Sequence, residues 1–499
     1  MLVREIRVVG STVFSPEELA PVTAPYLNRE LTAEDLEAIR VALTLLYVNR
    51  GYINSGAVLP DQRITEGVVT YQIVEGRLTD IDVDGNRWFR AGYVRRRLAL
   101  GADPPLNVNN LQQQLQLLLE DQRFRRLNAD LKPGLRPGEA TLSVTVEERL
   151  PYRLTLEANN YQSPSVGAER GTASLEHLNL TGWGDVLTLR YGRSEGLDPL
   201  LDFRYALPVT ARDTTLSLQY RKNTFAVVEQ DFRDLEIESD SKVYTLGLRH
   251  PFHRTPNAEF AVELIGERLS HVTSLLGEQF SLSPGARNGQ AVVTALRLTP
   301  EFVYRTQNQV IAARSRFSVG IDALGSTIHS DKDEPDSEFF AWLGQFQAVR
   351  RFPFLDTHAI WRVDLQLAND RLLTLEQIAV GGRYSVRGYR ENTFVRDNAF
   401  ITSLEVRVPV IRNTKWADFV QLAPFFDYGR SWNTKPPTGE PLDISSVGIG
   451  LRWALTFPAL VSVRPQLEVY WGHPLRNIET SGGDLQDDGI HFQFVVAFF

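Results

Sequence analysis

Two short runs in the C-terminal half of the sequence combine charged residues with glycines and aromatic residues. One is residues 380–389 (VGGRYSVRGY), within a long polar connection, and the other is residues 425–429 (FFDYG), within an apolar strand. An acidic residue inside an apolar strand is unusual, and an arginine guanidinium suits a carboxylate because it forms two parallel hydrogen bonds with it. We therefore predict that the connection folds back and places Arg387 against Asp427.

The candidate site residues of the connection are Val386, Arg387, Gly388 and Tyr389 with Gly381 and Gly382, and those of the strand are Phe425, Asp427 and Gly429. A desolvated Arg–Asp pair need not add stability, because the cost of desolvation can cancel the Coulomb attraction. Bidentate geometry is better suited to fixing one conformation of the loop. The alternative is an exposed arginine in a turn shaped by Gly388.

The composition limits the classes of protein to which these runs can belong. A chain of 499 residues is too long for one ordinary core, so we expect two or more domains. Cysteine is absent, which excludes disulfides and Cys-ligated metals, and the net charge of −8 argues against nucleic-acid binding. No run of about eighteen apolar residues predicts a transmembrane helix, and the strand-like opening run predicts no signal peptide.

Enzymatic and metal-binding functions are not predicted. The sequence contains no GxSxG, GK[ST] or HExxH motif, so we expect no catalytic residues and no cofactor. Residues 80–85 imitate a calcium loop, but Ala91 stands where a bidentate glutamate is required. We therefore expect no metal site there.

The first 149 residues contain an internal repeat. The pattern I-x-V-x-G-x-x-x-F at residues 6–14 recurs at residues 81–89, an offset of 75 residues. We therefore predict two copies of one α+β module, at residues 1–76 and 77–149. Each copy has the order strand, helix, helix, strand, strand. In the first copy Ser15 caps the first helix, and residues 32–35 open the second.

From residue 150 to residue 499 the helical period gives way to strand alternation. Segments of roughly ten residues alternate apolar with polar side chains, as at 187–191 and 216–220. We predict an all-β transmembrane barrel of about sixteen antiparallel strands. The alternative is a soluble β-sandwich or propeller, but a sandwich rarely extends this alternation so far, and the blade repeat of a propeller is absent.

Short and long connections alternate along the predicted barrel. Proline marks the short ones, near residues 208, 251, 353, 409 and 458. The long polar ones are residues 223–241, 268–290, 324–338, 369–397, 429–445 and 472–489. Outer-membrane barrels have short periplasmic turns and long external loops, so the modules, which fall on the side of the short turns, should be periplasmic. Barrel closure is assigned to the last strand, with Phe492, Phe494, Phe498 and Phe499.

These features resemble the Omp85 superfamily and, within it, the two-partner secretion (TpsB-type) outer-membrane transporters. The runs at 386–389 and 425–429 match the two barrel motifs of the superfamily. Residues 51–76 resemble the first periplasmic (POTRA) module of these transporters, and residues 171–185 resemble their second and third barrel strands. The resemblance covers nearly the whole chain, and two modules rather than five point to the secretion branch.

The resemblance implies a pore that exports a large, partly unfolded partner protein across the outer membrane. The POTRA modules would bind the partner's secretion domain, and the sixth barrel loop, at 369–397, would carry Arg387 to Asp427 on the inner wall. We expect a monomer in outer-membrane lipid, with no nucleic acid as a partner. Members of the family usually carry a plug helix before the first module, whereas here the first predicted strand begins at residue 3, so the sequence leaves open whether such a helix plugs the pore.

A sheet edge of the modules is the candidate binding surface for an extended segment of the partner, because main-chain hydrogen bonds give such pairing its affinity. The predicted edge residues are Ile53, Asn54, Ser55, Gly56, Ala57, Val58 and Leu59. This edge could instead be protected by the neighbouring module, and the equivalent edge or the Leu-rich helix of the second module could serve as well. Two other functions stay open, an assembly factor for outer-membrane proteins and a passive solute channel.

Overall fold

The computed structural model describes residues 1–230, 232–331, 333–434, 443–480 and 482–499, and its chain divides into two compact units. The module unit comprises residues 1–150 and 181–184, and the barrel unit comprises residues 151–180 and 185–499. Parts of the predicted loops at 223–241, 324–338, 429–445 and 472–489 lie outside the described residues. Within the described ranges, no helix has the length and the apolar character needed to cross a membrane.

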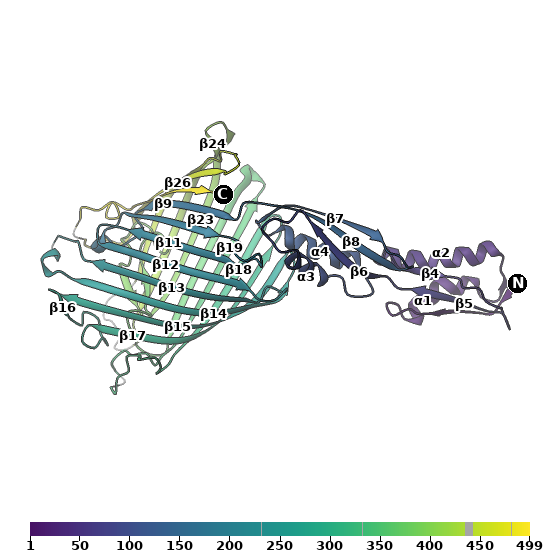
Figure 1. Ribbon diagram of the computed structural model, residues 1–499. Coiled ribbons are helices and arrows are strands. Elements are labelled where there is room, and N and C mark those ends of the chain that lie inside the picture. The colour runs from purple at the N-terminus through teal and green to yellow at the C-terminus, as the bar shows by residue number, and fades with distance from the viewer. Residues whose placement is uncertain (231, 332, 435–442, 481) are drawn as a thin grey trace. The chain divides into compact units, whose positions relative to one another are not determined.

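The first module is a three-stranded sheet with two helices (Figure 1). Its main elements are β1 (Leu2–Val3), β2 (Glu5–Val9), α1 (Pro16–Thr23), β3 (Arg29–Glu30), α2 (Ala33–Asn49), β4 (Gly56–Val58) and β5 (Val68–Val74). The sheet has the order β2-β5-β4, with β2 parallel and β4 antiparallel to β5. Both helices begin with a capping box, the predicted one at Ser15 and a second one at Thr32. Their apolar faces and the inner face of β5 form one core.

The strand predicted at 53–59 is shorter than expected. Residues 53–55 form a turn after α2, in which the Tyr52 N–H donates to the Tyr47 carbonyl oxygen and the Ser55 N–H donates to the Tyr52 carbonyl oxygen, each at 3.0 Å. The Ser55 hydroxyl then accepts a hydrogen bond from the Gly76 N–H at 2.8 Å. These local hydrogen bonds occupy backbone N–H and carbonyl groups that a longer strand would use to pair with β5, so β4 begins only at Gly56.

The second module repeats the arrangement. Its elements are β6 (Arg77–Asp84), α3 (Ala91–Ala99), α4 (Val108–Leu119), β7 (Phe124–Pro133) and β8 (Glu139–Glu148). The sheet has the order β6-β8-β7, with β6 parallel and β7 antiparallel to β8. Leu98 of α3, Leu111 and Leu118 of α4, and Leu142 of β8 lie in its core. The helical stripe of Leu111 and Leu118 therefore packs inward.

Among the described residues, sixteen antiparallel strands close into a barrel, as predicted, and the two-residue strand β16 adds to it (Figure 1). The sixteen are β9 (Tyr152–Asn159), β10 (Arg170–His177), β11 (Val186–Arg193), β12 (Leu197–Pro208), β13 (Thr215–Ala226), β14 (Glu238–Arg254), β15 (Ala258–Leu275), β17 (Gln290–Arg305), β18 (Gln309–Gly320), β19 (Phe340–Phe352), β20 (Thr357–Ala368), β23 (Asn398–Thr414), β24 (Ala417–Trp432), β25 (Asp443–Ala454), β26 (Val463–Pro474) and β27 (Ile490–Phe498). The added strand is β16 (Glu278–Gln279).

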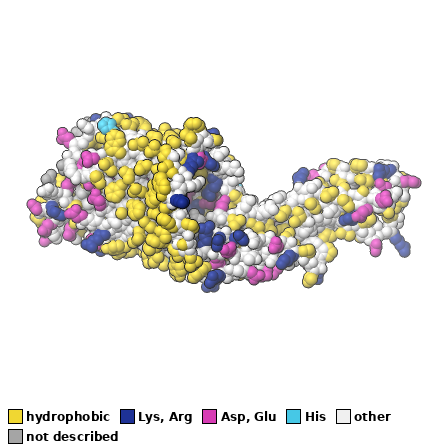
Figure 2. All heavy atoms as spheres, turned by 90° about the horizontal axis from the view of Figure 1, so that it is seen from above, with side chains coloured by type: hydrophobic (Ala, Val, Ile, Leu, Met, Phe, Trp, Pro, Cys, Tyr) yellow, Lys and Arg dark blue, Asp and Glu magenta, His cyan; other side chains and the backbone are white. Residues whose placement is uncertain are grey.

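The barrel has an apolar outer surface and a polar interior. Exposed leucines and aromatic residues alternate with inward polar residues along each strand, and Figure 2 shows hydrophobic side chains gathered around the barrel wall. On β24 the alternation is direct, because Phe426 is 44% exposed whereas Phe425 and Asp427 on either side are buried. This pattern suits a wall with lipid outside, since the strands satisfy their backbone groups among themselves.

Three of the five prolines assigned to short turns are strand residues instead, and Pro208 is the last residue of β12. Pro251 is in β14 and Pro409 is in β23, and the pairing register shifts immediately after each of them. Proline lacks an N–H for the ladder and is tolerated at such bulges, so the strand continues past it. The actual turns follow a few residues later, before β15 and β24.

Candidate functional site

The connection between β20 and β23, residues 369–397, contains a small hairpin of its own, β21 (Ile378–Val380) and β22 (Phe394–Arg396). We call this connection loop six. Val380, Val386 and Tyr389 of loop six are buried, and they form one apolar cluster with Ala399 and Ile401 of β23. Loop six is therefore packed against the inner wall of the barrel.

The structure brings Arg387 and Asp427 together with both side chains fully buried. The Arg387 Nε donates to Asp427 Oδ2 at 2.8 Å, and Nη2 donates to Oδ1 at 2.9 Å, which is bidentate geometry. The Arg387 backbone N–H also donates to Asp427 Oδ2, at 3.0 Å. One carboxylate thus fixes both the side chain and the backbone at the tip of loop six.

Three further groups surround the Arg387 guanidinium. Nη1 donates to Glu405 Oε2, and Nη2 donates to the Ser403 hydroxyl at 3.1 Å, both on β23. The guanidinium carbon lies 3.6 Å from the centre of the Phe425 ring, close enough for a cation–π contact. Because the charge is desolvated and every side-chain nitrogen has a partner, Arg387 cannot leave this position without leaving the Asp427 carboxylate buried and without its arginine.

Small residues allow loop six to approach the wall. Gly388 has φ +89, and a Cβ atom there would lie 2.7 Å from the carbonyl oxygen of Gly472 on β26. A Cβ atom on Gly429 would lie 2.6 Å from the Val380 side chain. The glycines of both motifs therefore provide space at the contact between the loop and the wall. Gly381 and Gly382, with φ +109 and +98, turn the chain after β21.

Other contacts anchor the loop on either side of Arg387. Arg383, which is buried, donates to Glu468 of β26 at 3.0 Å and to the Tyr161 hydroxyl at 3.3 Å. The Tyr389 hydroxyl donates to backbone oxygens of Ser445 and Arg476, each at 3.0 Å. Loop six is thus attached to several strands and loops of the barrel unit.

The base of loop six is attached to the wall formed by β15, β17 and β18. Glu376 accepts two hydrogen bonds from the guanidinium of Arg297 on β17, at 2.7 and 3.0 Å. The same guanidinium donates to Glu267 of β15 at 2.7 Å and to Ser318 of β18 at 2.8 Å. This second bidentate pair therefore holds the N-terminal part of loop six, before Arg387.

Sequence reasoning missed Glu405, Glu468, Glu376 and Arg297. The alternation of inward polar residues along β23, at 403, 405 and 407, contained a signal for Glu405. Arg297 and Glu468 follow the same alternation as many other lumen charges, and Glu376 stands in a polar loop, so the sequence does not distinguish them. Among the described residues, no cluster of His, Cys, Asp and Glu side chains could hold a metal ion.

The predicted edge of the first module is partly covered. Ile53 and Val58 are exposed, whereas Ser55 and Ala57 are buried. The Ala57 N–H donates to the Thr44 hydroxyl of α2 at 3.0 Å, and Arg40 donates to the Ala57 carbonyl oxygen at 3.5 Å. The outward backbone groups at the centre of β4 therefore already have partners.

The last strand closes the barrel. β27 pairs with β9 from Gln493 opposite Asn159 to Phe498 opposite Leu154. Phe494, on the same side of the strand as Phe492 and Phe498, is 41% exposed, whereas His491 on the other side is buried and accepts a hydrogen bond from the Gly388 N–H at 3.3 Å. Phe499 exchanges backbone hydrogen bonds with Ser462.

Comparisons with known proteins agree with this geometry. A family model described as haemolysin secretion/activation protein ShlB/FhaC/HecB matches residues 138–453. A model of the ShlB-type POTRA domain matches residues 1–76.

Curated relatives and solved structures show the same likeness. The outer membrane transporter CdiB of Dickeya dadantii is 25% identical over 398 residues, covering 78% of this chain and 69% of the relative. The heme/hemopexin transporter protein HuxB of Haemophilus influenzae is 21% identical over 462 residues, covering 88% and 78%. The structure of CdiB from Escherichia coli has a TM-score of 0.74 at 21% identity, covering 100% of this chain and 90% of the other. BamA from Haemophilus ducreyi lacking POTRA domains 1–3 has a TM-score of 0.57 at 14% identity, covering 100% of both chains.

Proposed function

Because this chain belongs to the ShlB/FhaC/HecB family of haemolysin secretion/activation proteins, we propose that it exports one large partner protein through its barrel. It is an outer-membrane transporter of the two-partner secretion type, and its POTRA modules are periplasmic, as predicted. The likeness to BamA concerns the fold alone, whereas the family match favours export over assembly of other barrels. The proposed activity is transport rather than catalysis. The transporter acts as a monomer, and the apolar outer wall of its barrel faces lipid.

The observation that carries the proposal is the attachment of loop six to the inner wall. A passive solute channel has no use for an arginine that is fully buried among two carboxylates, a hydroxyl and an aromatic ring. A pore that must admit a polypeptide needs a loop with one defined position, and a bidentate Arg–carboxylate pair provides it. The assigned role of Arg387 and Asp427 is therefore to position loop six for export.

We propose that the modules bind an extended segment of the partner's secretion domain at a sheet edge. The predicted edge at 53–59 keeps exposed side chains at Ile53 and Val58, although the central backbone groups of β4 have partners on α2. The second module offers the longer edge strand β7, whose outer face carries exposed polar residues such as Asn128. The length of β7 favours the second module as the site of strand addition.

The test is deletion of this chain in its host, followed by proteomics of the medium and of the outer membrane. The proposal predicts loss of one large protein from the medium while the other outer-membrane barrels keep their abundance. Broad depletion of outer-membrane barrels would instead identify an assembly factor. Unchanged medium and outer membrane, with a change only in uptake of small solutes, would identify a passive channel.

A further inference from the structure

A cavity of about 390 Å³ lies in the barrel lumen on the side of the short turns. Its wall includes His358 near the start of β20 and Phe419 near the start of β24, each within a few residues of a short turn. Glu405 at its wall is the residue that also binds Arg387. The cavity therefore lies between the short-turn end of the barrel and the tip of loop six, on the periplasmic side where an exported chain enters.

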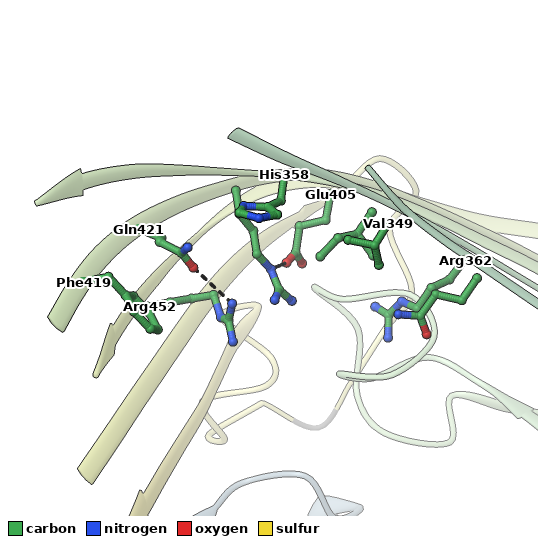
Figure 3. Close-up of a pocket in the computed structure, with 10 residues that line it drawn as sticks. Val349, His358, Arg362, Glu405, Phe419, Gln421 and Arg452 are labelled. Carbon is green, nitrogen blue, oxygen red and sulfur yellow. Dashed lines mark hydrogen bonds and ion pairs between the residues drawn. The ribbon is translucent and has the colours of Figure 1, made fainter. Parts of the chain in front are cut away.

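Positive charge dominates the wall of this cavity. Arg362, Arg407 and Arg452 line it together with His358, and Glu405 is the one carboxylate among its lining residues (Figure 3). Glu405 is shared, because it accepts hydrogen bonds from both Arg387 and Arg407. The Arg452 guanidinium donates to Glu468, which also accepts from Arg383. Each carboxylate in contact with the lining arginines thus already serves two arginines.

The arginines at and behind the cavity wall outnumber the carboxylates. Arg383, Arg387, Arg407 and Arg452 are bonded to Glu405, Asp427 and Glu468. Arg362, which lines the cavity without such a bond, makes this set five arginines against three carboxylates. Asp364, two residues along β20 from Arg362, accepts a hydrogen bond from Gln345 at 2.9 Å and lines no part of the cavity. Two positive charges of this set therefore have no carboxylate of their own.

Arg362 is the clearest case. Within the part of the chain that the structure describes, its guanidinium makes no hydrogen bond or ion pair. The charged groups that act on it are Arg383 and Arg387, which repel it, and Asp427 and Glu405, which are bonded to other arginines. In Figure 3 its side chain is drawn apart from the bonded pair of Gln421 and Arg452. A guanidinium held this way presents its donors to the cavity.

We propose that this cavity binds carboxylate side chains of an extended, acidic segment of the polypeptide in transit. The proposal rests on the proposed function and adds the chemistry of the segment that the lumen recognises. A volume of about 390 Å³ fits a few side chains and excludes a folded domain. Guanidinium groups bind carboxylates through parallel hydrogen bonds, and the low-dielectric wall strengthens that attraction.

The test measures binding of short fluorescent peptides to the detergent-solubilised full chain by fluorescence anisotropy. A glutamate-rich peptide is compared with its glutamine counterpart of the same length. We expect binding of the glutamate peptide only, weakened by salt, and binding about tenfold or more weaker for Arg362→Gln, which removes donors to a charged group. The matched control is Arg314→Gln, because Arg314 also faces the lumen but is paired with Glu301 at 3.1 Å, away from the cavity.

Each outcome decides for or against the proposal. Equal binding of the two peptides, or equal losses for Arg362→Gln and Arg314→Gln, would overturn it. Displacement of the peptide by an equal concentration of inorganic phosphate would assign the cavity to a free anion instead, whereas displacement only at far higher phosphate concentration supports a polypeptide ligand. Heat-modifiable migration in gels verifies that each variant barrel is folded, and Arg407→Gln provides a second variant. Because binding is measured without secretion, this inference and the proposed function can fail separately.

Discussion

In the two modules the most deeply buried side chains are apolar, with Ile39, Leu43 and Leu98 at 0% exposure, whereas in the barrel they include Arg387 and Asp427, also at 0%. The modules gain stability by removing apolar surface from water around helices and sheets. The barrel places its apolar side chains outside, and its closed strand ladder satisfies the backbone. Its interior is therefore free to hold charges that position a loop.

This difference predicts that equally buried substitutions act in different ways in the two units. In a module, a truncated core residue lowers the free energy of unfolding. In the barrel lumen, a neutralised charge leaves the ladder intact and releases loop six. The following experiments sharpen that contrast or break it.

The largest effect is expected for Asp427→Asn. Removing one partner of a buried ion pair costs about 3–5 kcal/mol. After this substitution Arg387 keeps one carboxylate, Glu405, which it shares with Arg407. We expect the amide protection of loop six to fall about 100-fold or more in hydrogen exchange followed by mass spectrometry, while the barrel strands keep theirs. The matched control is Asp364→Asn, a lumen carboxylate bonded by Gln345. Loss of protection throughout the barrel would show that the pair maintains the fold and would break the contrast.

A smaller effect is expected for Leu43→Ala in the first module. Leu43 lies fully buried between α2 and the sheet, and such truncations cost about 2–5 kcal/mol. Amides of β2 and β5 should exchange about 30-fold faster or more, with no change in loop six. Leu45→Ala, on the same helix but 49% exposed, should leave exchange near the wild-type rate. A comparable change in the barrel would contradict the independence of the two interiors.

Binding of the partner should depend on the module edges rather than on their cores. A photo-cross-linking residue replaces Asn128 on β7, Val58 on β4 or, as a control, Val41 on the exposed face of α2. We expect the highest yield of cross-linked partner at Asn128, a lower yield at Val58 and background at Val41. A higher yield at Val58 would favour the first-module edge, and equal yields at all three positions would argue against strand addition.

The smallest effect concerns pH and a single carboxylate. Burial alone would raise the pKa of Glu75, but hydrogen bonds from Thr12, Val13 and Tyr47 hold it below the usual 4.5. A lowered folded-state pKa contributes stability that is present above the usual value and is lost as pH falls through the folded value. Protection of the first module should therefore decline between about pH 5 and pH 3. Glu75→Gln should flatten this decline, and an unchanged decline would exclude Glu75 as its source.

The barrel and its strand count were predictable because the alternation of apolar and polar residues indicates which side of each strand faces lipid. Arg387 and Asp427 were identifiable because each stands in a local pattern that differs from ordinary strands. The arginine and carboxylate pairs at Glu376 and Glu468 were not, since Glu468 alternates like other lumen charges and Glu376 stands in a polar loop. The partner of Glu468 depends on strand register and that of Glu376 on how loop six packs, and both depend on contacts distant in sequence.

The strand at 53–59 illustrates a second limit. Its residues alternate suitably, but the hydrogen bonds of Ser55 and Ala57 to Gly76 and Thr44 shorten the strand and occupy part of its outer edge. Contacts between side chains and backbone of this kind are specific to the folded arrangement. At Pro251 and Pro409 the strands are longer than the sequence suggests. Proline usually ends a strand, but a bulge next to each of these prolines allows the strand to continue.

The central claim is that the Arg387 contact positions loop six for export. The most direct test compares secretion of the partner by wild type, by Arg387→Ala and by the control Arg314→Ala, with outer-membrane levels of each barrel measured alongside. We expect Arg387→Ala to be present and folded in the membrane while secretion falls about tenfold or more, with Arg314→Ala near wild type. Secretion by Arg387→Ala at the wild-type level would contradict the account.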